Sequence, residues 1–361
     1  MKLNTVNAEH LTGGEMRYSY INTLPNGRQI YEISVLIYRD ALGGGANFDD
    51  PLYTTIYNLD NNTFRNKSIK LFTSNISTLP LNDLGPCAKQ VPNVRIEKAI
   101  YTFRDTVALN TFGYMFVHQR CCRPSNLSNL NRPGDQGSTY SVHLTRAAMD
   151  ANNSNPIFIQ EPPILMCIGS NFEYQFASTD INGNRLRYYL CEPFIGGNNN
   201  SNAGVRPVTA SLPPYIPVQY ATGHSATQPF GPDVEVILNP NTGLIAFSPS
   251  RLGIFTVAVC VEEFDINDQS IGIYKRDIQF NVADCIVATA SASIDAAEPV
   301  EGVFATCKGQ TIQFKNKSID AQSYFWDFGI DGIQSDTSTL KEPIYTFPDS
   351  GKYNITLIIN K

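Results

Sequence analysis

Two neighbouring stretches near the N-terminus constrain the fold more than any other part of the sequence. Apolar and polar residues alternate in Glu15–Thr23 and again in Gln29–Tyr38, and a Pro-Asn-Gly turn separates the two runs. A period of two sets one face of a strand against a core, and an Asn-Gly turn between such runs indicates a β-hairpin. Long helical periodicity is almost absent elsewhere, so the sequence predicts an all-β protein.

Further strand-like runs continue the pattern along the chain. Those before a linker at Asn152–Pro163 are Leu52–Asn58, Ser68–Phe72, Val94–Phe103, Gly113–His118 and Thr139–Leu144. Those after it are Phe172–Ala177, Arg185–Leu190, Val234–Leu238, Gly253–Val261, Ile271–Val282, Thr311–Lys315, Ser323–Phe328, Ile344–Phe347 and Lys352–Ile359. Short strands joined by many turns are typical of β-sandwiches. We expect three modules in series, at residues 1–155, 156–285 and 286–361.

Composition narrows the classes of function. The chain has 361 residues, 42% hydrophobic and 11% aromatic, which is enough for two or three folded domains. The net charge is −6 and no run of Lys or Arg exceeds two residues, which argues against nucleic-acid binding. No apolar run approaches the roughly 20 residues that cross a bilayer, so no membrane span is expected.

The two ends of the chain carry weaker signals. The opening MKLNTVNAEHLTGGE has no apolar core, so it is not a signal peptide, and either a cytosolic protein or a mature exported segment fits. The last run of residues ends within an expected closing strand, so we interpret the chain as the front of a longer polypeptide.

The stretch HQRCCRP, at His118–Pro124, carries two adjacent cysteines between two arginines. On a strand they would point to opposite faces, and their Cα separation of about 3.8 Å is below the usual disulfide range. We therefore expect Cys121 or Cys122 to pair with Cys87, closing a loop of about 34 residues. A buried free thiol and a reactive or metal-binding thiol are the alternatives. A catalytic thiol is disfavoured because the only nearby base, His118, lies on the same strand.

The other cysteines are expected to form disulfides in the second and third modules. Cys167 and Cys191 lie at strand ends that meet at one pole of a sandwich, so we place their pairing first. Cys191–Cys260 is the alternative, and Cys285 and Cys307 bracket the first strand of the third module. The absence of any C-x-x-C spacing argues against zinc and favours an oxidising, exported environment.

One loop carries oxygen-bearing side chains at alternate positions. Asp180, Asn182 and Asn184 surround a glycine with the spacing that calcium loops use. Only one is a carboxylate, so an ordinary Asx turn is favoured over a Ca²⁺ site. Further calcium ligands would come from a neighbouring loop: Glu262, Glu263 or Asp265. No nucleophile-elbow, zinc-protease or nucleotide-binding motif occurs, so we expect no enzymatic activity.

Three motifs near the C-terminus resemble a known family. They are YFWDFG at Tyr324–Gly329, PIYTF at Pro343–Phe347 and SGKYNITLIIN at Ser350–Asn360. Together they resemble the PKD domain, a small immunoglobulin-like sandwich with a W-D-F-G-D-G motif and a later G-x-Y-x-V-x-L strand. Ile330 stands where that family usually has Asp. The resemblance implies that Trp326 is a core residue rather than a platform for a sugar.

The earlier modules resemble parts of bacterial surface proteins. Ser178–Leu190 and Leu238–Glu263 are similar to cadherin-like and immunoglobulin-like repeats. With GGEMRYSYI, YEISVLIYRD and GYMFVHQRCCRP before this module and a PKD-like module after it, the order resembles the front of very large Bacteroidetes surface proteins. Those proteins leave the cell through the type IX secretion system. The resemblance implies a secreted or surface-anchored protein of adhesion or gliding, without enzymatic activity.

The function expected from these features is binding and spacing outside the cell. Loops on rigid sandwiches would contact surface glycans or proteins, while neighbouring modules of a longer chain pack in series. Tyr215 and Tyr220, at the end of the loop Gly196–Pro214, are candidate ligand contacts. Thr106, in Asp-Thr-Val, resembles the O-glycosylation site of exported Bacteroidetes proteins. The alternatives are an accessory region of a secreted hydrolase and an inert structural stalk.

Overall fold

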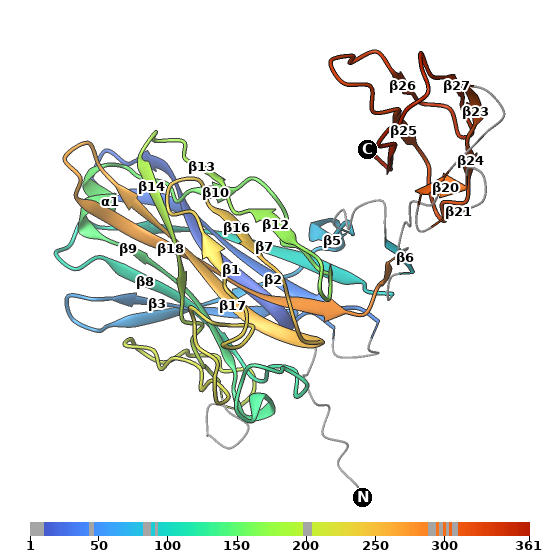
Figure 1. Cartoon of the computed structure of the whole chain (residues 1–361). Helices are drawn as coiled ribbons and strands as arrows, with labels where there is room; N and C mark the ends of the chain where they lie inside the picture. The colour runs from blue at the N-terminus through green and yellow to red at the C-terminus, as the bar shows by residue number, and fades with distance from the viewer. Residues whose placement is uncertain are drawn as a thin grey trace, which may run out of the picture. The chain divides into compact units, whose positions relative to one another are not determined.

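The computed structural model describes residues 11–42, 47–81, 88–90, 93–197, 204–287, 294–295, 299–300, 303–304 and 310–361. The chain divides into two compact units (Figure 1). The first comprises residues 1–84 and 92–284, and the second comprises residues 85–91 and 285–361. Nearly all regular structure is β, so the predicted all-β class is confirmed.

The centre of the first unit is an eight-stranded sheet in the order β14-β17-β18-β1-β2-β7-β5, with β11 beside β18. Its strands are β1 (Leu11–Thr23), β2 (Gln29–Asp40), β5 (Ile76–Thr78), β7 (Ile96–Val107), β11 (Met166–Cys167), β14 (Arg185–Cys191), β17 (Gly253–Phe264) and β18 (Ser270–Ala283). β1 and β2 form the predicted hairpin, and Gly27 occupies its turn with a φ of +78°. All neighbours are antiparallel except β11 and β18.

A four-stranded sheet covers one face of this central sheet. Its order is β4-β3-β8-β9, from β3 (Leu52–Asn58), β4 (Phe64–Ile69), β8 (Tyr114–Arg120) and β9 (Ser138–Leu144). One core cluster joins the two sheets, with Met16 and Val35 from the central sheet against Phe116 and Val142. Gly14 permits this approach, because a Cβ there would lie 2.9 Å from the Tyr140 ring.

The opposite face of the central sheet carries a second core. Phe255, Val257 and Phe280 pack there against Ile245 and Phe247 of a three-stranded sheet in the order β12-β16-β15. Its strands are β12 (Phe172–Gln175), β15 (Ile237–Leu238) and β16 (Leu244–Phe247), and the small pair β10 (Ile157–Phe158) and β13 (Ser178–Thr179) lies beside the same core. Alternation along each strand separates the two cores, since neighbouring residues face opposite sides.

The expected boundary between residues 155 and 156 therefore does not separate two compact bodies. Strands from both sides of it share the central sheet, where Gly13 pairs with Ile278 and Glu15 with Arg276. The first unit is two sandwiches built on one common sheet rather than two sandwiches in series. The short helix α1 (Arg146–Asp150) lies near this point, capped by the Thr145 side chain, and buries Ala148 and Met149 in the core. Two 3₁₀ turns, η1 (Thr73–Asn75) and η2 (Pro133–Asp135), complete the unit.

The second unit has short strands around an aromatic core. They are β6 (Ala88–Gln90), β19 (Ile286–Val287), β20 (Ile294–Asp295), β21 (Pro299–Val300), β22 (Val303–Phe304), β23 (Thr311–Gln313), β24 (Lys315–Asn316), β25 (Tyr324–Asp327), β26 (Thr337–Ser338), β27 (Ile344–Thr346) and β28 (Thr356–Ile359). β25 lies between β26 and β28, while β23 pairs with β27. Trp326 is 0% exposed and packs with Phe314, Phe328 and Phe347, which confirms its predicted place in the core.

Candidate functional site

The two cysteines of HQRCCRP bond to each other. Cys121 and Cys122 form a disulfide across a cis peptide bond, with their Cα atoms 3.0 Å apart, and both are buried. The expectation that one of them pairs with Cys87 is therefore wrong, and Cys87 itself lies outside the described residues. The expectation assumed strand alternation and a trans peptide, but β8 ends at Arg120, one residue before the pair. Neither cysteine is a free thiol, so the reactive-thiol and zinc alternatives are excluded.

The residues around the pair bind other segments of the chain. His118 is buried, its Nδ1 lies 2.8 Å from the Tyr53 carbonyl, and burial lowers its pKa. Arg120 Nε lies 2.9 Å from Asp49 Oδ2, and its Nη1 donates to the Val205 carbonyl at 2.9 Å. These contacts join the end of β8 to the segment before β3 and to the long loop near residue 205. The geometry is that of a structural junction rather than of a nucleophile with its base.

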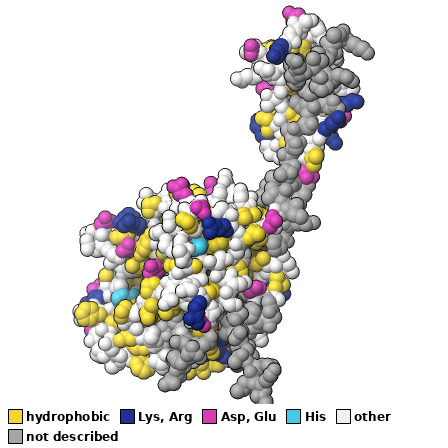
Figure 2. Space-filling view, turned by 60° about the horizontal axis from the view of Figure 1, so that its bottom comes forward, with side chains coloured by type: hydrophobic (Ala, Val, Ile, Leu, Met, Phe, Trp, Pro, Cys, Tyr) yellow, Lys and Arg dark blue, Asp and Glu magenta, His cyan; other side chains and the backbone are white. Residues whose placement is uncertain are grey.

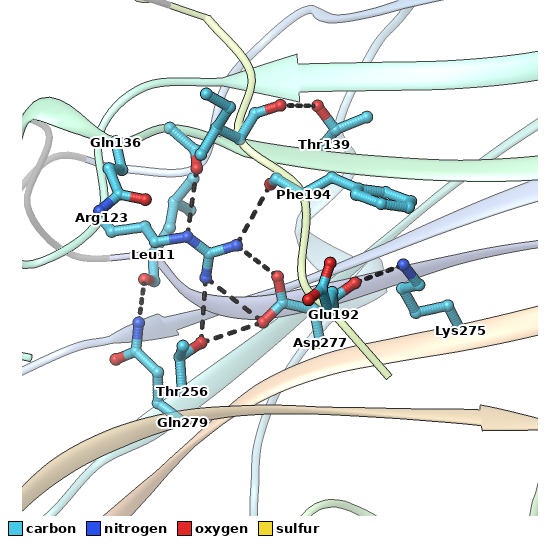
Figure 3. Close-up of polar contacts among 12 residues, drawn as sticks. Leu11, Arg123, Gln136, Thr139, Glu192, Phe194, Thr256, Lys275, Asp277 and Gln279 are labelled. Carbon is cyan, nitrogen blue, oxygen red and sulfur yellow. Dashed lines mark hydrogen bonds and ion pairs between the residues drawn. The ribbon is translucent and has the colours of Figure 1, made fainter. Parts of the chain in front are cut away.

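Arg123 extends this junction to the central sheet (Figure 3). Its Nη2 lies 2.5 Å from Asp277 Oδ2, and the two side chains are only 1% and 2% exposed. Its Nε donates to the Gly137 carbonyl at 3.1 Å, and its Nη1 donates to Thr256 Oγ1 at 3.1 Å. Burial disfavours the charged guanidinium, but Asp277 outweighs that effect and raises the pKa of Arg123. The ion pair fastens the loop after β8 to β18.

Among the remaining cysteines, Cys191 forms the pair that the sequence analysis gave as the alternative. Cys191 bonds to Cys260, so the first choice, Cys167–Cys191, is wrong. The strands β14 and β17 are adjacent, with Tyr189 opposite Cys260. The Cα atoms of Cys191 and Cys260 are 5.9 Å apart. Cys167 and Cys285 are disulfide-bonded as well. Cys307, the expected partner of Cys285, lies outside the described residues.

The loop predicted as an Asx turn or a calcium site forms the turn. Asp180 Oδ1 accepts a hydrogen bond from the Asn184 backbone N–H at 3.0 Å. Asn182 Oδ1 accepts from the Ser154 N–H at 3.0 Å, and Asn184 Nδ2 donates to Asn153 Oδ1 at 2.9 Å. Each of the three side chains therefore has a different hydrogen-bond partner, and the three do not converge on one point as ligands of a calcium ion would. In the described part of the chain, no cluster of three or more His, Cys, Asp or Glu side chains has metal-binding geometry.

A pocket of about 600 Å³ lies where β7 has no neighbour on one side. Among the described residues, β5 pairs with β7 only at positions 97–99, and farther along β7 Asp105 forms an ion pair with Arg65 of β4 in the other sheet. Four basic side chains and one carboxylate line the pocket: Arg28, Arg65, Lys67, Arg104 and Asp105. On the face drawn in Figure 2, by comparison, basic and acidic side chains are interspersed.

The single carboxylate does not neutralise the pocket. Asp105 is 9% exposed and accepts two hydrogen bonds from Arg65, while Lys67 Nζ lies 3.7 Å from its other oxygen. Arg104 pairs with Glu32 at 3.1 Å. Arg28 donates to the Thr106 carbonyl at 2.9 Å and takes part in none of the ion pairs found between described residues. The pocket therefore favours an anionic group, because cations there exceed acids. Sequence reasoning missed it, since its residues come from four strands.

Other predicted contact residues occupy less open positions. Thr106 lies within β7, is half-buried and lines the same pocket, and its modification stays a prediction. Tyr215 is half-buried, packing 5.7 Å from the Phe194 ring, and its hydroxyl is buried. Tyr220 is half-buried beside Leu130. Neither tyrosine presents an open face for a sugar, which weakens their assignment as ligand contacts.

The C-terminal unit has a recognisable family. A family model described as "PKD domain" matches residues 295–361. These residues form a PKD domain. Its motif turn is held internally, since Asp327 Oδ1 accepts from the Gly329 N–H at 2.9 Å and Asp336 Oδ2 accepts from the Ile330 N–H at 2.8 Å. No curated protein matches the chain.

Proposed function

We propose that the chain is a non-enzymatic extracellular protein that binds surface glycans or proteins and spaces its binding unit from its anchor. The observation that carries this proposal is a PKD domain joined in one chain to a disulfide-bonded all-β unit. PKD domains are extracellular modules of the adhesion type. Disulfides such as Cys191–Cys260 persist in oxidising compartments, which supports the same location. None of the helices in the described part of the chain is long and apolar enough to span a membrane.

The basic pocket beside β7 is the best candidate for ligand contact. Arg28 and Lys67 face a cavity large enough for a sugar residue, and no carboxylate there pairs closely with Arg28. A carboxylate, sulfate or phosphate on a surface polysaccharide would form charge-assisted hydrogen bonds with these side chains. A rigid site on strands also fits binding without chemistry, because no nucleophile and base are paired in it.

The finer identity rests on the order of sequence motifs. Similarity to the front of large Bacteroidetes surface proteins supports a substrate of type IX secretion that acts in adhesion or gliding. Two alternative functions are an accessory region of a secreted hydrolase and an inert structural stalk. A hydrolase motif in the gene downstream of Lys361 would favour the accessory region, whereas further PKD repeats would favour the adhesin.

Binding is tested with the full chain and beads coated with heparin, alginate or neutral dextran. We expect retention on the polyanions and not on dextran. Hydrogen bonds between charged groups contribute about 1.5–3 kcal/mol each, so the variant Arg28→Glu/Lys67→Glu should bind at least about tenfold more weakly. Arg132→Glu is the matched control, because Arg132 is exposed and distant in sequence from the pocket strands.

Two results would contradict the proposal. Equal retention of the wild type and the double variant on the polyanion beads would show that the pocket does not bind the polyanion. Failure of the wild type to bind either polyanion or intact cells would favour the inert stalk.

A further inference from the structure

Two acidic side chains meet at one end of the central sheet, next to the second core. Glu263, in β17, is 0% exposed, and its Oε1 accepts hydrogen bonds from Asn153 Nδ2 at 3.0 Å and Asn184 Nδ2 at 3.4 Å. Its other oxygen, Oε2, is buried without a hydrogen-bond partner. Asp180 lies in the turn after β13, and its Oδ1 accepts a hydrogen bond from the Asn184 N–H. Its Oδ2 is likewise buried without a hydrogen-bond partner.

The two carboxyl groups lie beside each other, because Asn184 donates to both of them. Burial, and then the adjoining Asp180 carboxyl, raise the pKa of Glu263 to about 8. Neither group takes part in any ion pair found between described residues. Two buried carboxylates repel each other unless a proton or a cation lies between them.

The surroundings supply oxygen atoms that suit a cation. The Asn153 and Asn184 amides hold Oε1 of Glu263, so Oε2 is left for another partner. The Tyr18 hydroxyl is a further buried oxygen without a partner, and the charge of Glu263 acts on it. Asp180 is half-buried, so the turn that carries it borders on solvent. Carboxylate and hydroxyl oxygens are the ligands that hard cations prefer, and calcium tolerates irregular sets completed by water.

We propose that Ca²⁺ binds between Asp180 Oδ2 and Glu263 Oε2. The ion would tie the turn between β13 and β14 to β17, the strand that pairs with β14. Extracellular calcium modules bind with a Kd of about 10⁻⁴–10⁻³ M, and a site with two carboxylates falls in that class. The site differs from the sequence prediction, which placed Asn182 and Asn184 as ligands. Of the further ligands expected beside Asp180, namely Glu262, Glu263 and Asp265, the structure brings Glu263, 83 positions away along the chain, to Asn184 beside Asp180.

Calcium chloride titrated into the metal-free full chain tests the site by calorimetry and by thermal unfolding. We expect saturable binding with a Kd near 1 mM or below and a rise in the melting temperature of the first unit by about 2–4 °C. Asp180→Asn keeps an oxygen for the Asn184 N–H but removes the charge, so calcium binding should weaken at least about tenfold. Glu262→Gln is the matched control, since this neighbour on β17 faces the opposite side of the sheet.

Each outcome has a defined meaning. Loss of calcium binding in Asp180→Asn, with binding retained in Glu262→Gln, supports the site. If the Asp180 variant does not fold, Glu263→Gln gives the same test, because a neutral amide can still accept from the two asparagines. No saturable binding by the wild type, or binding unchanged in the variants that remove either carboxylate, would overturn the proposal. These measurements are independent of polyanion binding, so either proposal can fail alone.

Discussion

Neutralising Asp277 should destabilise the first unit through the charge left on Arg123. The two side chains are 1% and 2% exposed, and the structure shows no water-accessible position for the guanidinium. Breaking a buried ion pair by removing one charge costs about 3–5 kcal/mol of unfolding free energy, because the other charge loses its compensation. For a unit of this size, each kcal/mol of lost unfolding free energy lowers the melting temperature by about 2 °C. The variant Asp277→Asn should therefore lower the melting temperature by about 6–10 °C.

Calorimetric unfolding of the full chain measures this effect. Asp135→Asn is the control, because its ion pair with Arg132 is exposed and such pairs contribute about 0–1 kcal/mol. The double variant Arg123→Met/Asp277→Leu should recover part of the loss, since no lone charge remains. It should not recover all of it, because the Gly137 carbonyl loses its donor. A loss in Asp277→Asn no larger than that in Asp135→Asn would refute the argument.

Three further predictions concern stability. Replacing Cys191 and Cys260 together by Ala should lower the unfolding free energy by about 4 kcal/mol in denaturant titration, because the bond closes a loop of 69 residues; an unchanged midpoint would contradict this. Trp326→Ala should destabilise the PKD domain by about 3–5 kcal/mol, measured by circular dichroism because Trp326 is the only tryptophan of the chain, and an unchanged unfolding midpoint would contradict a core role. Burial lowers the pKa of His118 below its usual 6.5, so its contribution to stability is present above that value and is lost as pH falls. His118→Gln should therefore flatten the decline of stability between about pH 7 and 5, and an identical slope in both proteins would count against it.

Most of the longer strands were readable from the sequence because side-chain alternation is local, but the expected strand Ser68–Phe72 is wrong, since β4 spans Phe64–Ile69. Leu52–Asn58 forms β3 with the predicted bounds, and the Pro-Asn-Gly turn joins β1 and β2 as expected. The partnership of strands was not readable, since alternation shows which residues face a core but not which strand lies alongside. β1 pairs with β18, so that Glu15 bonds to Arg276 across 261 positions. Because of that pairing, the two expected sandwiches share one central sheet.

The candidate sites depended on the same long-range pairing. Asp180 was identified from local spacing, and Glu263 was one of three acidic residues expected beside it. The spacing did not show which of the three the packing of the turn on β17 would bring close. The pocket was missed because Arg28, in the turn before β2, and Lys67, in β4, are far apart along the chain and no motif joins them. At Cys121 the local argument failed for another reason, since β8 ends one residue earlier and strand geometry no longer applies.

The claim that the chain acts outside the cell is tested most directly by its thiols. Mass-spectrometric mapping of the protein isolated from the organism that makes it, alkylated before and after reduction, separates bonded from free cysteines. The account predicts that Cys191–Cys260 and Cys121–Cys122 are recovered as disulfides before reduction. Eight alkylated free thiols before reduction would contradict an exported, disulfide-bonded protein.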